Sequence, residues 1–239
     1  MDFRKSLLIS LTCALLSLSE SANAENLVGV KDTDLKNTSV AFLTDTSLNW
    51  AIGWTQSISS FNVSVSAVLD TNVGAVPANW WITDVIGPET TSANVIYSGQ
   101  YIAPELKIPD DLINFNSAPM TVLAKGLDFR PGTYYLVIDG APGPLPNNTG
   151  WVGSGNYSYN IKTRPGFSLG NLYYSRFYDT KAVFGPSSTF DVFVPGYMNS
   201  FSLNGAVPEP ETWSLLITGF GIIGGAFRSR RPRSNLKAA

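Results

Sequence analysis

Apolar and polar residues alternate with a period of two through much of residues 25–206, whereas no helical period lasts for a dozen residues. In the stretch FNVSVSAVL, polar Asn62, Ser64 and Ser66 separate apolar neighbours, which predicts a half-buried strand. The apolar side chains expected together on one face of that strand are Phe61, Val63, Val65 and Ala67. Further strands are expected around residues 50–55, 80–86, 95–98, 120–124, 132–140, 157–161, 189–194 and 201–203.

The predicted strands are short, and loops rich in Gly, Pro, Asn and Ser separate them. This spacing favours an all-β fold, an antiparallel β-sandwich or a jelly roll. The stretch APGPLPNNTGWVGSGN, residues 141–156, is predicted to be an exposed loop with Trp151 near its middle. Neither a low-complexity linker nor an internal repeat divides residues 25–206, so we expect one domain there.

Charge and composition limit the classes of function that this chain can have. Residues 25–206 carry 14 acidic and 9 basic side chains, a net charge of −5 that would repel phosphate backbones, so we expect no nucleic-acid partner. The chain has no histidine, and Cys13 is its single cysteine. These counts exclude an intrachain disulfide, a Cys or His catalytic group and a Cys/His zinc site.

The first 24 residues have the pattern of a secretory signal peptide. A basic pair at residues 4–5 precedes an apolar run over residues 7–18, and the small residues Ala22 and Ala24 follow. We therefore expect export and cleavage after Ala24. Cleavage there would remove Cys13 and leave a mature chain without cysteine.

The chain ends in a short apolar segment followed by arginines. Residues 213–227 contain no charge, and as a helix they would extend about 22 Å, less than the roughly 30 Å hydrocarbon core of a bilayer. An interfacial Trp213 and snorkelling arginines would close part of this gap, with the basic end staying in the cytoplasm. The residues that we assign to this membrane stop are Trp213, Leu215, Leu216, Gly219, Arg228, Arg230, Arg231 and Arg233.

The tail carries a motif in a fixed order, with Val207, Pro208, Glu209 and Pro210 first, the apolar segment next and the arginines last. This order resembles the PEP-CTERM sorting signal of Gram-negative bacteria that make exopolysaccharide. The resemblance implies export, transient anchoring in the inner membrane by the carboxyl-terminal helix, and cleavage near Pro-Glu-Pro by a membrane-embedded exosortase. The mature part would then reach the cell surface or the extracellular matrix.

These signals divide the chain into three parts. We expect a signal peptide over residues 1–24, a β-sandwich ectodomain over residues 25–206 and the sorting signal over residues 207–233. The partners implied are the export machinery, the exosortase, the membrane before processing, and exopolysaccharide.

Candidate chemistry within the domain is sparse. Asp32 with Asp34, and Asp110 with Asp111, are close carboxylate pairs that could contribute to a Ca²⁺ site, although we favour the interpretation that they are solvated turn residues. Neither pair has the spacing of a known calcium loop, and the chain lacks a nucleophile elbow, a P-loop and a dinucleotide fingerprint. We expect no other cofactor.

The remaining feature of the sequence is its content of tryptophan and tyrosine, six and ten residues respectively. Trp80 and Trp81 should point to opposite faces if they share a strand, so that one of them could offer an exposed ring to a sugar. Trp151 is a further candidate for sugar stacking, while core packing is the ordinary role of such side chains.

Three functions fit these observations. We favour a non-enzymatic surface or matrix protein associated with exopolysaccharide or biofilm. A hydrolase acting on carbohydrate through Asp or Glu alone is an alternative, although the sequence nominates no carboxylate pair. A self-assembling adhesin that pairs through its sheet edges is another.

Overall fold

The computed structural model describes residues 24–32, 39–44, 48–71, 76–103, 120–140, 149–154, 159–176, 190–193, 197–208 and 217–221. The chain divides into two compact units, Met1–Ala206 and Val207–Ala239, which are described separately. In the first unit, the described residues form an all-β fold whose strand pairings are antiparallel, which confirms the expected fold class.

Two large sheets and one small sheet build the first unit. The five-stranded sheet runs, from edge to edge, through β11 (Tyr159–Thr163), β1 (Glu25–Asp32), β15 (Phe201–Ala206), β4 (Ser60–Ala67) and β8 (Thr121–Phe129). The six-stranded sheet runs through β13 (Asp191–Val192), β12 (Phe167–Arg176), β3 (Leu48–Gln56), β9 (Gly132–Gly140), β6 (Val76–Thr83) and β7 (Val95–Ala103). The small sheet contains β14 (Met198–Asn199), β10 (Thr149–Ser154), β2 (Ser39–Thr44) and β5 (Leu69–Thr71).

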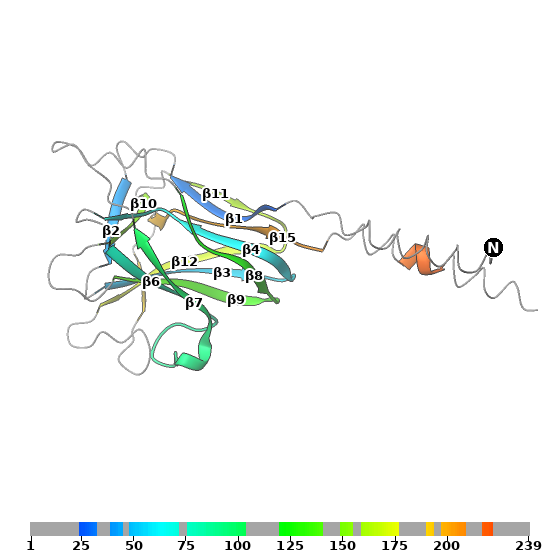
Figure 1. The fold of residues 1–239 in the computed structure, drawn as a ribbon, viewed down its shortest axis with the longest axis horizontal. Coiled ribbons are helices and arrows are strands. Elements are labelled where there is room, and N and C mark those ends of the chain that lie inside the picture. The colour runs from blue at the N-terminus through cyan, green and yellow to red at the C-terminus, as the bar shows by residue number, and fades with distance from the viewer. Residues whose placement is uncertain are drawn as a thin grey trace, which may run out of the picture. The chain divides into compact units, whose positions relative to one another are not determined.

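The chain passes repeatedly between the two large sheets. β3 and β4, β7 and β8, β8 and β9, and β11 and β12 are consecutive strands that lie in different sheets. Figure 1 shows the two sheets stacked, with β2 and β10 of the small sheet toward one end. The short helix η1 (Ser92–Asn94) lies in the connection between β6 and β7. This connectivity is the jelly-roll-like sandwich that the short, turn-separated strands predicted.

Trp54 lies at the centre of the core between the sheets. Its ring centroid is 5.7 Å from that of Phe129 and 6.3 Å from that of Phe201, both on the five-stranded sheet. On its own sheet it lies 5.6 Å from Tyr134. Tyr134 also donates a 2.8 Å hydrogen bond from its hydroxyl to the carbonyl oxygen of Arg130, in the turn where the chain crosses from β8 to β9. Aromatic packing thus joins the sheets beside a hydrogen-bonded corner.

A buried amide organises the same end of the core. Gln56, the last residue of β3, donates from Nε2 to the carbonyl oxygen of Ile58 at 2.9 Å and to that of Phe129 at 3.3 Å. The same nitrogen lies 3.2 Å from the hydroxyl oxygen of Ser60. Buried carbonyl groups need such donors, so Gln56 ties the turn between β3 and β4 to the facing strand β8.

The alternation predicted for β4 holds only in part. Val63, Val65 and Ala67 are buried, as expected, but Phe61 is 45% exposed. The pairing of β4 with β8 shifts register between Ser60 and Val63, and Asn62 has a φ of 50°. This bulge interrupts the alternation, so Ser60 is buried and Phe61 turns outward; the prediction for Phe61 was wrong.

The predicted loop around Trp151 is also wrong where the structure describes it. Residues 149–154 form β10, and Trp151 is 0% exposed. Its indole N–H donates to the carbonyl oxygen of Ser200 at 3.0 Å, an oxygen that also accepts from the backbone N–H of Val68 at 3.2 Å. This strand also contains Gly150 and Gly153, and pairing with β2, β5 and β14 overrides the preference of glycine for loops.

Candidate functional site

The tail begins immediately after the last strand of the domain. β15 ends at Ala206, Val207 and Pro208 follow in irregular conformation, and residues 217–221, which include Gly219, are helical. Among the residues that the structure describes, no helix has the length and hydropathy needed to cross a membrane. The other predicted tail residues lie outside the described ranges: Glu209, Pro210, Trp213, Leu215, Leu216, Arg228, Arg230, Arg231 and Arg233.

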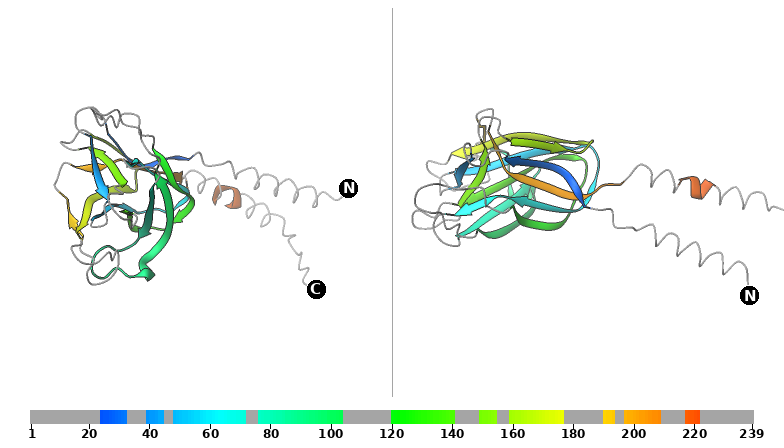
Figure 2. Two further views of the ribbon diagram at one scale, coloured as in Figure 1. Left: turned by 60° about the vertical axis from the view of Figure 1, so that its left-hand side comes forward. Right: turned by 90° about the horizontal axis from the view of Figure 1, so that it is seen from above.

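The amino-terminal end of the domain lies beside this carboxyl-terminal end. Ala22 is outside the described residues, while Ala24 is exposed and directly precedes β1. Glu25, which cleavage after Ala24 would leave as the first residue, pairs with Gly205 in the register between β1 and β15. The right-hand view of Figure 2 shows the blue β1 and the orange β15 running side by side. The two predicted processing sites therefore adjoin neighbouring strands at one end of the sandwich.

Further contacts hold β1 at this end. The carboxylate of Glu25 forms an ion pair with the guanidinium of Arg164. The backbone N–H of Arg164 also donates to the carbonyl oxygen of Leu27 at 2.9 Å. On the five-stranded sheet, the side-chain amide of Asn26 donates to Oδ1 of Asn204, its partner on β15, at 3.3 Å. The ends of β1 and β15 are thus joined through side chains as well as through the strand ladder.

The three tryptophans considered for sugar stacking have different environments. Trp80 and Trp81 lie in β6 and point to opposite faces, as the alternation predicted. Trp80 is 6% exposed and packs inward over Gly99, where even a Cβ atom would come within 2.5 Å of its ring. Trp151 is fully enclosed. Burial leaves neither Trp80 nor Trp151 a free ring face, so these two candidates are corrected to core residues.

Trp81 belongs to a second cluster on the outer face of the six-stranded sheet. Ala51 and Val137, at 0% and 1% exposure, form its base, and partly exposed apolar side chains pack over them. Those covering side chains are Trp81, Ile86, Tyr135, Tyr173 and Phe190. We refer to Trp81, Tyr135 and Tyr173 as the outer aromatic band.

Sequence reasoning missed the two tyrosines of this band. They occur in the pairs Tyr134–Tyr135 and Tyr173–Tyr174, and a strand sends neighbouring side chains to opposite faces. One ring of each pair therefore faces outward. The Tyr135 and Tyr173 rings are 5.8 Å apart at an angle of 74°, and burial, together with the nearby Tyr173, raises the pKa of Tyr135 above its ordinary value of 10.0. The two Tyr-Tyr pairs were therefore the sequence feature that could have predicted outward-facing tyrosine rings.

The structure gives little support to a metal site in the part of the chain that it describes. No three His, Cys, Asp or Glu side chains come together there in a way that could hold an ion. The candidate Ca²⁺ residues Asp34, Asp110 and Asp111 lie outside the described residues, and of Asp32 only the backbone is described.

The comparison with protein families concerns the tail. Residues 206–231 match the model of the PEP-CTERM protein-sorting motif. The match confirms the resemblance drawn from the residues and supports an exported protein that an exosortase sorts to the cell envelope or surface. No curated protein was found to match the chain. The evidence for sorting therefore rests on the tail, and the role of the β-domain must be argued from its own surface.

Proposed function

We propose that this chain is a non-enzymatic protein of the cell surface or extracellular matrix that associates with exopolysaccharide once its sorting tail is removed. The observation that carries the proposal is the sorting motif over residues 206–231, which begins at the last residue of the last strand of the domain. Such a tail serves to deliver an exported domain to the outside of the cell.

The positions of the first and last strands are consistent with removal of both terminal signals before the domain functions. The first strand begins at Glu25 and the last ends at Ala206, so cleavage after Ala24 and near Pro208 would leave every described strand in place. β15 is an interior strand between β1 and β4, which makes it essential to the five-stranded sheet. Processing at these sites would therefore release an intact sandwich.

The non-enzymatic role is supported by chemistry. The chain has no histidine, and its one cysteine lies in the predicted signal peptide. Histidine is the most frequent general acid or base in catalysis, and cysteine is one of the common nucleophiles. The outer aromatic band instead offers a binding surface, which supports the association with polysaccharide.

The proposal can be tested in the cells that make the protein. A matrix fraction should contain the protein and should release it when glycoside hydrolases digest the polysaccharide. Incubation in buffer alone is the control, and the hydrolase preparations must be free of protease. A chain lacking residues 207–239 should be absent from the matrix fraction. Recovery of the protein in the matrix regardless of polysaccharide digestion would contradict the association with polysaccharide while leaving the sorting reading intact.

A further inference from the structure

The outer face of the six-stranded sheet carries the outer aromatic band in two adjacent rows. In one row the register aligns Tyr173 with Ala51, Ala51 with Val137 and Val137 with Trp81. In the next row, Tyr135 lies opposite Gly53. The middle positions of these rows are small or covered side chains, so the three large rings determine the shape of this surface.

Gly53 allows Tyr135 to lie close against the sheet. A Cβ atom at residue 53 would come within 3.1 Å of Cε1 and 3.2 Å of Cδ1 of Tyr135, closer than nine in ten real Cβ contacts. Tyr135 therefore covers the backbone of β3, and it remains partly exposed on the side away from the sheet. An aromatic ring held in this way offers an ordered apolar surface without a further loss of side-chain entropy on binding.

Polar amides border the band along the next row toward the amino-terminal end of β6. Asn79 pairs with Gln100 in the ladder between β6 and β7, and Gln100 Nε2 donates to Asn79 Oδ1 at 3.1 Å. Among the described residues, no hydrogen bond involves the side-chain N–H groups of Asn79 or the side-chain carbonyl oxygen of Gln100, which leaves these groups to a ligand. Amide groups of this kind both donate to and accept from hydroxyl groups.

Charge narrows the chemistry of the ligand. None of the described side chains in these rows is lysine or arginine. The domain as a whole carries a net charge of −5. A polyanion would therefore be repelled, whereas a neutral sugar chain presents apolar C–H faces to rings and hydroxyl groups to amides.

We propose that Trp81, Tyr135 and Tyr173, with Asn79 and Gln100 beside them, form a binding surface for a neutral polysaccharide on the outer face of the six-stranded sheet. This inference rests on the proposed association with exopolysaccharide and adds the site and the charge class of the glycan. Binding sites of this type combine a mostly apolar surface with a few well-placed polar groups.

The test uses the full chain, purified in detergent, and polysaccharide extracted from the cells that produce it, separated by anion exchange into neutral and acidic fractions. We expect affinity electrophoresis to show retention by the neutral fraction. Trp81→Ala should weaken that retention about tenfold, the range expected for a central aromatic contact. Gln100→Ala, at an exposed residue where unfolding is not a concern, should weaken it several-fold.

Phe61→Ala is the matched control, because Phe61 is an exposed aromatic residue on the other sheet. Its affinity should stay within about twofold of the wild type, as expected outside a binding hot spot. Retention of the wild type that survives Trp81→Ala and Gln100→Ala would overturn the site but not the proposed function. Binding to the acidic fraction alone would likewise overturn the site but not the proposed function. The absence of binding to either fraction would contradict both the site and the proposed association with polysaccharide.

Sizing of the same variants separates a glycan site from an interface between copies of the chain. If the band binds glycan, Trp81→Ala should leave the apparent mass unchanged. A wild-type dimer that Trp81→Ala converts to a monomer, with glycan retention unaltered, would assign the band to self-association and overturn the inference.

Discussion

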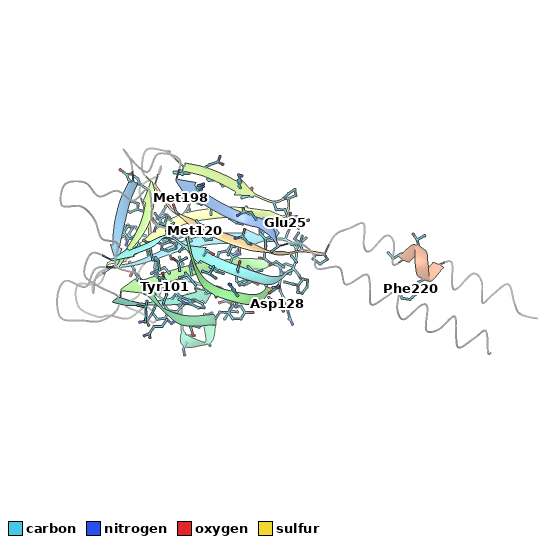
Figure 3. All side chains as sticks on the ribbon, turned by 45° about the horizontal axis from the view of Figure 1, so that its top comes forward. Glu25, Tyr101, Met120, Asp128, Met198 and Phe220 are labelled. Atoms are coloured by element: carbon cyan, nitrogen blue, oxygen red, sulfur yellow. The ribbon has the colours of Figure 1, made fainter. Side chains whose placement is uncertain are left out.

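Glu25 and Gly205 lie opposite each other in the ladder between β1 and β15, although 180 positions separate them in the sequence. Figure 3 shows Glu25 and Asp128 toward one end of the sandwich and Met198 toward the other. The first and last strands of the domain are thus interior neighbours in one sheet. The domain should complete this sheet only when residues 201–206 have been exported.

This pairing predicts a sharp limit for truncation. A chain of residues 25–206 should unfold in one cooperative transition, because it retains every described strand of the domain. A chain of residues 25–200 lacks β15 and should show no cooperative transition, since β1 and β4 then lose their shared partner. Urea denaturation followed by tryptophan fluorescence compares the two, and equal midpoints would refute the role given to β15.

Gln56 should be the most costly polar residue of the core to replace. Gln56→Leu keeps the approximate volume but removes the donor to the carbonyl oxygens of Ile58 and Phe129. We expect a loss of about 1–3 kcal/mol in the free energy of unfolding, the cost of leaving buried polar groups unpaired. Thr55→Ala, at the exposed neighbouring position, should cost less than about 1 kcal/mol. Comparable losses for both variants would argue against the buried network.

Tyr97 closes the gap between the edge strands β7 and β8. Its hydroxyl donates to the carbonyl oxygen of Asp128 at 2.9 Å and accepts from the backbone N–H of the same residue at 3.2 Å. Tyr97→Phe should cost about 1 kcal/mol and speed hydrogen exchange at the Asp128 amide. Tyr101→Phe is the control on the same strand, because its hydroxyl has no hydrogen bond among the described residues. Unchanged exchange at Asp128 in Tyr97→Phe would show that the bridge is not maintained in solution.

Buried tyrosine should make the fold sensitive to alkali. Burial raises the pKa of Tyr134 above its ordinary value of 10.0. As the pH rises above 10, the unfolded chain releases the tyrosine proton before the folded chain does, so stability falls. Tyr134→Phe should be less stable near neutral pH but should lose less stability between about pH 9 and pH 11. Urea midpoints across this range measure the difference, and parallel curves would count against the assignment.

Local patterns in the sequence predicted the fold class and several strands. Alternation placed Val63, Val65 and Ala67 inside, and it separated Trp80 from Trp81 correctly. Local patterns failed where distant contacts decide the outcome. The bulge at Asn62 arises in the pairing of β4 with β8 and reverses Phe61, and β10 forms because other strands pair with a glycine-rich segment.

The candidate sites show the same division. The order of the tail motif is local, so the sequence alone was enough to recognise the sorting signal that the family comparison confirms. The outer aromatic band depends on the alignment of β12, β3, β9 and β6, which no single stretch of sequence contains. Of its three rings, only Trp81 could therefore be nominated from the sequence.

The mass of the protein recovered from the cell surface tests the central claim, sorting by the carboxyl-terminal motif, most directly. Intact-mass spectrometry should find a chain that begins at Glu25 and ends near Pro208–Pro210, with the apolar segment and the arginines removed. A variant in which Pro208, Glu209 and Pro210 are all replaced by alanine should accumulate uncleaved in the membrane fraction. Surface-localised wild-type protein that still ends in RSRRPRSNLKAA would contradict the account.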